Sequence, residues 1–318
     1  MADYPDYPGD FVTFGPGANC TLDLCPIWTT VYNYRPSLAA NLTFAILFGV
    51  ALVAHAILGV WWRSWWFMWC IIVGCLDEML GYAGRIWLHY DPWNFNAFMI
   101  QIVCLTIGPV FYCAAIYVVL ARTITEFGPE LSRFPPRLFY WIFIPCDIVS
   151  LILQGAGGGM STTSSGTNQT GVDLALAGLA FQVFTLVVFS ALYVDYLVRC
   201  WAAGRALGGG GAGRLQLRGR LGVFFGFMGL AIALTLARCA FRVDELSEGY
   251  DGALVHNEKL FIGLEGVLII ASVFSLCLGH PGLIFGREDR AAAGALSADD
   301  SRAESGLSGA EEKMRRES

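Results

Sequence analysis

The sequence predicts an all-α membrane protein with seven transmembrane helices. Of its 318 residues, 56% are hydrophobic and only 14% are charged, which is less charge than a soluble domain of this length carries. The apolar residues come in blocks of roughly 20, the length that a helix needs to cross a bilayer. The short alternating segments of a transmembrane barrel are absent from the sequence.

The expected elements follow one another with short connections. An N-terminal tail, residues 1–37, is rich in Pro, Asp, Tyr and Gly, and a seven-helix domain is expected over residues 38–285. Its spans are expected at about residues 38–60, 65–89, 97–120, 138–154, 172–197, 221–241 and 260–278. Residues 286–318 are rich in Ala, Ser, Glu and Arg and are expected to form a disordered tail.

Local signals delimit the first four spans. Only Trp61–Ser64 separates spans one and two, and the tryptophans there are typical of a membrane interface. A turn with Pro and Asn, residues 89–94, separates spans two and three. Pro135 and Pro136 precede span four, and the glycines of residues 155–159 are expected to end it.

The last three spans are delimited in the same way. An uncharged Ser/Thr loop precedes span five, and an arginine-rich loop around Gly208–Gly211, expected to be a flexible linker, follows it. Gly222 and Gly226 are expected to let span six pack closely on a neighbour. His280 and Pro281 end span seven.

The distribution of arginine predicts the orientation of the chain. Arginines are found in the loops after spans one, three and five, and essentially none in the loops after spans two, four and six. By the positive-inside rule the N-terminus is outside and the C-terminus is cytoplasmic. Two glycosylation acceptors, Asn19 and Asn168, then fall outside. Asn41 also matches the pattern but lies too close to the bilayer to be used.

The ten cysteines do not indicate a disulfide scaffold, because most lie in apolar spans and are expected to be small core residues. Cys20 and Cys25 lie close together in the tail that is expected outside the cell. A disulfide between them is favoured, with two free thiols as the alternative. The first 36 residues lack the features of a cleavable signal peptide, so span one is expected to act as its own insertion signal.

Span two carries ionisable residues at membrane depth. On a helical wheel Asp77, Glu78 and Arg85 fall within roughly one third of the circumference, together with several glycines. A charge at this depth costs about 2.5–3.5 kcal/mol on insertion scales. It is tolerated where the residue faces the bundle interior, pairs with another charge or lines a wet cavity.

Polar residues of other spans are expected at a similar depth, between the midplane and the outer surface, given a rise of about 1.5 Å per residue. The candidate ligand-binding residues are Asp77, Glu78, Arg85, Gln101, Asp147, Gln154, Gln182, Arg238, Arg242 and Glu265. The acids would pair with the arginines and hold the helices together, or the whole set would line a cavity open to the outer leaflet. The cavity accounts better for the shared depth, because small residues and packing suffice for helix association. Asp195 is expected to pair with Arg199 near the inner face.

Motifs spread along the chain resemble those of one known family. They are Glu78, Gly81-Tyr82 and Arg85, then Gln101, Pro109, Asp147, Ser150, Gln154, Gln182, Phe241-Arg242 and His280-Pro281. Over about residues 38–282 the chain resembles the fungal lipid-translocating exporters, the RTA-like seven-span proteins. It departs from the family in span seven, where a Tyr-x-Phe-Asp pattern is expected and Phe261–Glu265 stands instead.

The resemblance implies a fungal multi-pass protein of the plasma membrane that exports sphingoid long-chain bases or moves them between leaflets, with resistance to toxic amphiphiles. Its partners would be the lipid bilayer and an amphiphilic lipid. The four acids would compensate the amine, the glutamines would bind hydroxyls, and Arg238 and Arg242 would suit a phosphate or carboxylate. No nucleotide-binding motif is present, so pumping would use an ion gradient, with a proton on Glu78 or Asp147, or another protein.

Two other classes of function are alternatives to a transporter. A receptor or sensor for a lipid-like ligand fits the seven-span topology, although topology alone does not carry function. An intramembrane zinc hydrolase would need several histidines that converge on one metal. The four histidines are His55, His89, His256 and His280, and His280 and His55 are not expected to share a site with the others or with each other. The chain is therefore expected to be no enzyme and to hold no metal or other cofactor.

The charge pattern bears on partners as well. Lysine is nearly absent and no basic stripe is present, so nucleic-acid binding is not expected. The oligomeric state stays open.

Overall fold

The computed structural model describes residues 11–163, 169–206, 212–249, 252 and 254–285. These residues contain helices and no strand, and seven of the helices are long and apolar enough to cross a membrane. The predicted fold class is confirmed. The glycosylation acceptor Asn168, the linker Gly208–Gly211 and the tail of residues 286–318 lie outside the described residues.

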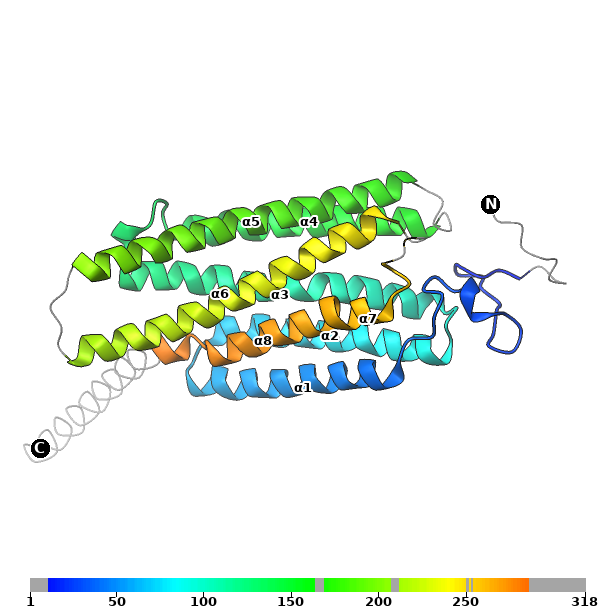
Figure 1. The fold of residues 1–318 in the computed structure, drawn as a ribbon, viewed down its shortest axis with the longest axis horizontal. Helices are drawn as coiled ribbons and strands as arrows, with labels where there is room; N and C mark the ends of the chain where they lie inside the picture. Colours follow the sequence, from blue (N-terminus) through cyan, green and yellow to red (C-terminus); the bar gives the residue numbers. More distant parts are fainter. Residues whose placement is uncertain (1–10, 164–168, 207–211, 250–251, 253, 286–318) are drawn as a thin grey trace, which may run out of the picture.

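The seven spans run back and forth along the long axis of the molecule (Figure 1). The first six are α1 (Leu38–Trp61), α2 (Trp65–Tyr90), α3 (Phe95–Phe127), α4 (Arg137–Thr163), α5 (Gln169–Ala206) and α6 (Ala212–Ser247). The seventh consists of α7 (Glu258–Leu260), the π-helical segment η3 (Phe261–Val267) and α8 (Leu268–Leu278). Of two short 3₁₀ turns, η1 (Ile27–Thr29) lies in the segment before α1 and η2 (Pro129–Leu131) in the connection between α3 and α4.

Helix α3 lies in the middle of the bundle (Figure 1). Its residues Tyr112, Ala115 and Leu120 have no exposed surface, and they belong to one large hydrophobic core. Asn94 caps the start of α3, since its side chain accepts a hydrogen bond from the Ala97 backbone N–H at 3.0 Å. By contrast α1 exposes residues such as Ile57 along its length, as expected for a helix that faces lipid.

Glycines bring α4 and α5 into close contact. A Cβ atom on Gly157 would lie 2.3 Å from the Ala175 backbone nitrogen, and one on Gly171 would lie 2.7 Å from the Ser161 nitrogen. The prediction that residues 155–159 end span four is therefore wrong. Packing against α5 keeps these glycines helical to Thr163 despite their low helix propensity, because tertiary contacts supply most helical stability in proteins.

The expected close packing at Gly222 and Gly226 is also wrong. A Cβ atom at either position would meet no described atom within 4 Å. Close approaches to backbone atoms of a neighbouring helix occur instead between α4 and α5 and between α2 and α3. In the latter contact, a Cβ on Gly84 would lie 2.9 Å from the Ala97 carbonyl oxygen.

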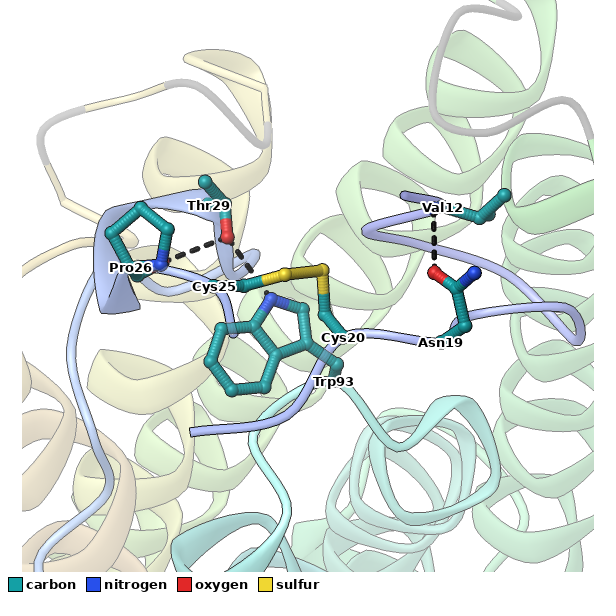
Figure 2. Close-up of a disulfide and its surroundings, with 7 residues drawn as sticks. All are labelled: Val12, Asn19, Cys20, Cys25, Pro26, Thr29 and Trp93. Carbon is teal, nitrogen blue, oxygen red and sulfur yellow. Dashed lines mark hydrogen bonds between the residues drawn. A yellow bond between two sulfur atoms is a disulfide. The ribbon is translucent and has the colours of Figure 1, made fainter. Parts of the chain in front are cut away.

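Residues 11–37 fold over the end of the bundle where α2 ends and α3 begins, and we call them the N-terminal cap (Figure 1). The favoured disulfide between Cys20 and Cys25 is present (Figure 2). Beside it, the Trp93 indole N–H donates a hydrogen bond of 3.1 Å to the Thr29 hydroxyl (Figure 2). The cap is thus attached to the connection between α2 and α3, where Trp93 is buried.

The opposite end of the bundle holds the predicted pair of Asp195 and Arg199. The Arg199 Nε donates to the Asp195 carboxylate at 2.9 Å, so this pairing is confirmed. Arg133, from the connection between η2 and α4, donates to both oxygens of the same carboxylate. All three side chains are partly exposed, so we assign them little weight in stability.

Candidate functional site

A cavity of about 150 Å³ lies between α3, α4 and α6, beside the N-terminal cap. Three of the ten predicted site residues line it, namely Gln154, Arg238 and Arg242. The polar lining is completed by Tyr32 of the cap, Thr106 and Glu245, and most of the other lining residues are aliphatic or glycine. A polar wall facing apolar side chains is the usual composition of a site for a small amphiphilic ligand.

The glycine run of α4 has two different faces at this cavity. Gly157 packs against α5, as described above. Gly155, Gly158 and Gly159 line the cavity, and a Cβ atom at each would meet no described atom within 4 Å. One stretch of sequence therefore both holds α4 against α5 and leaves room on the side of the cavity.

Arg238 forms a buried ion pair with Glu265 of η3. The Arg238 Nε donates to Glu265 Oε2 at 3.0 Å, and Nη2 donates to the second carboxylate oxygen and to the Leu105 carbonyl. Such a fork of two parallel hydrogen bonds is the strongest arrangement for arginine and carboxylate. It neutralises the arginine charge at the cavity wall. Glu265 lies in a π-helical segment, a distortion that is frequent at functional sites.

Arg242 pairs with Glu245 one turn further along α6, and both residues line the cavity. Glu245 follows the predicted end of span six at residue 241 and is not among the predicted site residues. Helix α6 instead continues to Ser247, so Arg242 and Glu245 face one another at helical spacing. That spacing was the signal in the sequence that could have identified Glu245.

Among the described residues, Arg85 is held by polar and aromatic side chains and not by a carboxylate. Its Nε donates to Asn41 Oδ1 at 3.1 Å and its Nη2 to the Tyr34 hydroxyl at 3.0 Å. The guanidinium carbon lies 3.7 Å from the centre of the Phe261 ring, which places the cation over an aromatic face. Sequence reasoning missed Asn41, Tyr34 and Phe261 as neighbours of this arginine.

The cap reaches the site through two tyrosines. Gln101 Nε2 donates to the Tyr32 hydroxyl at 2.8 Å, and the Tyr32 ring lies 5.3 Å from the guanidinium carbon of Arg85. Burial raises the pKa of Tyr32, and it also raises the pKa of Tyr34, so both hydroxyls stay protonated at physiological pH. Neutral hydroxyls can accept these hydrogen bonds and still donate one each.

The other two predicted glutamines, Gln154 and Gln182, contact each other at the cavity wall. Gln154 Nε2 donates to the Gln182 side-chain oxygen at 3.0 Å and to the Ser150 hydroxyl at 2.7 Å. The Ser150 hydroxyl in turn donates to the Gly178 carbonyl. This network orients the Gln154 amide between α4 and α5.

Three predicted acids do not line the cavity, and no ion pair is found for them among the described residues. Glu78 is 2% exposed, its Oε1 has no hydrogen-bond partner in the described part of the chain, and a Cβ on Gly108 would lie 2.7 Å from that oxygen. Asp147 lies beside Tyr117 and Thr185. Asp77 is only partly buried and lies beside Cys104 on α3.

Two of the four histidines lie closer together than the sequence predicts. The rings of His55 and His280 lie 6.2 Å apart, because the turn after α8 folds back against the end of α1. The expectation that they lie apart is wrong. His55 Nε2 is within 3.2 Å of the Val273 carbonyl oxygen, and His280 Nδ1 accepts from the Gly282 N–H. Over the described residues, no three His, Cys, Asp or Glu side chains converge as metal ligands would.

Comparison with known proteins supports the resemblance seen in the motifs. A family model described as RTA1 like protein matches residues 71–288, more than half of the chain. A protein of Saccharomyces cerevisiae strain Lalvin EC1118, named sphingoid long-chain base transporter RSB1, is 32% identical over 279 residues, which cover 79% of this chain and 73% of the relative.

Two further proteins match the chain at lower identity. Protein RTA1 of Saccharomyces cerevisiae is 27% identical over 79% of this chain and 84% of its own length, and protein RTM1 of the same species is 28% identical over 68% of each. No solved structure matches the chain. With a family model over most of its membrane-spanning part and a relative above 30% identity, this chain belongs to the RTA1-like protein family.

Proposed function

We propose that this protein binds sphingoid long-chain bases, or amphiphiles of similar chemistry, and moves them across the membrane as a transporter rather than an enzyme. The observation that carries the proposal is the identity of 32% over 79% of the chain with a protein named for that transport. The cavity between α3, α4 and α6 supports it, since ion pairs and apolar side chains line the same space.

The cavity offers a distinct partner for each part of such a lipid. A protonated amine would share the Glu245 carboxylate with Arg242, and a hydroxyl would bind the Gln154 amide. The alkyl chain would lie along Ile102 and Leu151. Pockets for drug-sized ligands measure about 300–1,000 Å³. The smaller cavity here would therefore hold the headgroup while the chain extends between helices toward the bilayer.

Most of the predicted site residues that do not line the cavity enter the proposal with other roles, while Asp77, which is only partly buried, is given none. Glu265, Gln182, Arg85 and Gln101 would support the wall by contacts with Arg238, Gln154 and the cap. Glu78, or Asp147 as the alternative, would carry a proton during transport, because burial away from water favours the neutral, protonated form of a carboxyl group and access of water or substrate would release the proton. We place the cap outside the cell and the protein in the plasma membrane.

A cavity-filling substitution tests this assignment. Gly155 lines the cavity and Gly226 does not, and a Cβ at either position would meet no described atom within 4 Å. Gly155→Leu and Gly226→Leu are thus matched changes on exposed helix surfaces. The assay is the transfer of sphinganine across the bilayer of proteoliposomes, followed by extraction with albumin.

We expect Gly155→Leu to lower the transfer rate at least tenfold and Gly226→Leu to leave it within twofold of the unchanged protein. Equal rates for the two variants would rule out this cavity as the site. Binding of sphinganine by the unchanged protein without any transfer would instead favour a receptor or sensor.

A further inference from the structure

A groove of about 450 Å³ lies between α4 and α5, which run side by side (Figure 1). Residues 138–146 of α4 and 181–192 of α5 contribute to it, together with Phe134 of the connection before α4. Among the described residues that line it, all but Thr185 and Cys146 are aliphatic or aromatic. The groove shares no lining residue with the cavity described above, so it is a separate space on the same pair of helices.

The groove is open toward the bilayer. Ile142 on α4 and Phe184 on α5 line it with 48% and 63% of their surfaces exposed, as is usual for side chains that face lipid. The lining residues Phe139 and Phe143 are buried instead, and the Phe143 ring lies 5.4 Å from the ring of Tyr117 on α3. An alkyl chain can therefore enter from the side, while α3 closes the groove toward the bundle interior.

The groove has about the length of one leaflet. Its lining residues on α4 extend from Leu138 to Cys146, which is about 12 Å of helix. The hydrocarbon core of a bilayer is about 30 Å thick, so one leaflet accounts for about 15 Å. The volume of the groove also falls within the range of about 300–1,000 Å³ that is typical of ligand sites. An alkyl chain aligned with the two helices fits this space.

A buried carboxyl group lies at the end of the groove that is nearer to the cap. Asp147 is one turn beyond Phe143 on the same face of α4, and it lies beside Thr185, which lines the groove. Its side chain is 2% exposed, and its Oδ2 has no hydrogen-bond partner among the described residues. A buried polar atom without a partner is costly, so this oxygen marks a place where a polar group of a ligand would bind.

The same face of α4 leads from Asp147 to the cavity. Ser150 and Gln154 follow Asp147 at helical spacing, and Gln154 lines the cavity. Ser150 is bonded to the Gly178 carbonyl and Gln154 to the Gln182 side chain, both on α5. One seam between two helices thus changes from an apolar groove, past a carboxyl group, to the polar wall of the cavity.

We propose that a sphingoid base, or another long-chain amine, binds at this seam with its amine at Asp147 and its alkyl chain in the groove. This binding mode rests on the transport proposed above and adds the place where the headgroup passes the middle of the membrane. An amine is favoured over a phosphate or a carboxylate, because Asp147 is an acid and the described residues that line the groove include no lysine or arginine.

The test is photo-crosslinking of the full-length protein in proteoliposomes with sphinganine that carries a diazirine and an alkyne in its alkyl chain. Labelled peptides are identified by mass spectrometry. We expect labels on the groove residues of α4 and α5, and a loss of at least fivefold with Asp147→Asn. Asp77→Asn removes an acid that is partly buried and lines neither space, and it should change the labelling less than twofold. Unlabelled sphinganine should compete for the groove, and stearic acid should not.

A second pair of variants tests the groove if Asp147→Asn does not fold. Val188→Trp fills the groove, and Val194→Trp is its control on the same helix, since Val194 is exposed and lines neither space. Val188→Trp should reduce the labelling at least threefold, and Val194→Trp less than 1.5-fold. Equal labelling of the unchanged protein and Asp147→Asn, or equal competition by sphinganine, stearic acid and ergosterol, would overturn the proposal.

The transfer assay described above separates this proposal from the proposed function. Transfer of sphinganine without any label in the groove would overturn the binding mode at the seam and leave the transport in place. Label in the groove without transfer would overturn the transport and leave a binding site for the amine. Cross-links that join two copies of the chain through the groove would overturn the binding mode, because a second copy would then occupy that space.

Discussion

Arg238 of α6 and Glu265 of η3 face each other inside the bundle with 1% and 3% of their side chains exposed. Arg238 also lines the cavity, so one guanidinium both joins two helices and forms part of the proposed lipid site. A buried pair of this kind contributes little net stability as a pair, but breaking it leaves an uncompensated charge.

We therefore expect Glu265→Gln to lower the free energy of unfolding by about 3–5 kcal/mol, the usual cost of an isolated buried charge. The double change Arg238→Met with Glu265→Leu should recover most of that loss, because no charge then remains. Thermal unfolding of the purified protein in detergent would measure both. A double variant that is less stable than the single one would show that the pair is favourable in itself.

The close contact of α4 and α5 depends on the absence of a side chain at Gly157. Gly157→Val would push a Cβ against the Ala175 nitrogen at 2.3 Å, and backbone cannot move aside as a flexible side chain can. Overpacking typically costs about 1–3 kcal/mol, and a backbone clash costs more. We expect loss of the monodisperse peak in size-exclusion chromatography. Gly226→Val, in open space, should elute as the unchanged protein does; if both variants elute normally, α4 and α5 do not pack as described.

Tyr32 ties the cap to α3 through its hydroxyl. Tyr32→Phe leaves the amide of Gln101, which is 3% exposed, without that acceptor, at a cost of roughly 1–3 kcal/mol. Hydrogen exchange of the backbone amides in the cap should accelerate, while exchange in α3 stays slow. Tyr90→Phe, at an exposed site on the last turn of α2, is the control and should leave the exchange pattern unchanged.

The same tyrosines predict a response to alkaline pH. Burial raises the pKa of Tyr32 above its ordinary value of 10.0, and that of Tyr34 as well, so the folded state favours the neutral hydroxyls. Their contribution to stability is complete below pH 10 and is lost as the pH rises further. The variant Tyr32→Phe with Tyr34→Phe should therefore lose less thermal stability than the unchanged protein between about pH 9 and 11. An equal loss of thermal stability with rising pH in the variant and in the unchanged protein would contradict this account.

Glycosylation would report the orientation of the bundle. Asn19 is exposed in the cap, whereas Asn41 is 2% exposed and hydrogen-bonded to Arg85. If the cap lies outside the cell, a glycosidase should increase the electrophoretic mobility of the protein. Asn19→Gln should diminish or abolish that shift, and Asn41→Gln should not. No shift for the unchanged protein, together with labelling of the cap from the cytoplasmic side, would reverse the proposed orientation.

Features that depend on neighbouring residues in the chain were predictable. The number of spans follows from the length of the apolar blocks, because each block alone must cover the bilayer. Cys20 and Cys25 are five residues apart, and the pairing of Asp195 with Arg199 follows from helical spacing. Arg238 and Gln154 were found as wall residues because polar groups at membrane depth must face the interior.

Features that depend on distant segments were not predictable in this way. Glu245 was missed although its helical spacing from Arg242 is present in the sequence, because the expected span ended with the apolar block at residue 241. Tyr32 and Tyr34 were missed because nothing local places the cap against Arg85. His55 and His280 were expected apart, and only the turn after α8 brings their rings together.

The sequence by itself thus determined the class of the protein, its seven spans and most of the polar residues inside them, because burial in lipid selects residue types one helix at a time. Only the tertiary structure decided which of those residues share a wall. In that structure Glu78 and Asp147 do not line the cavity, and Arg238 pairs with Glu265. The reason is that the rotation and spacing of packed helices depend on contacts between helices, such as that of Gly157 with α5, which no single helix contains.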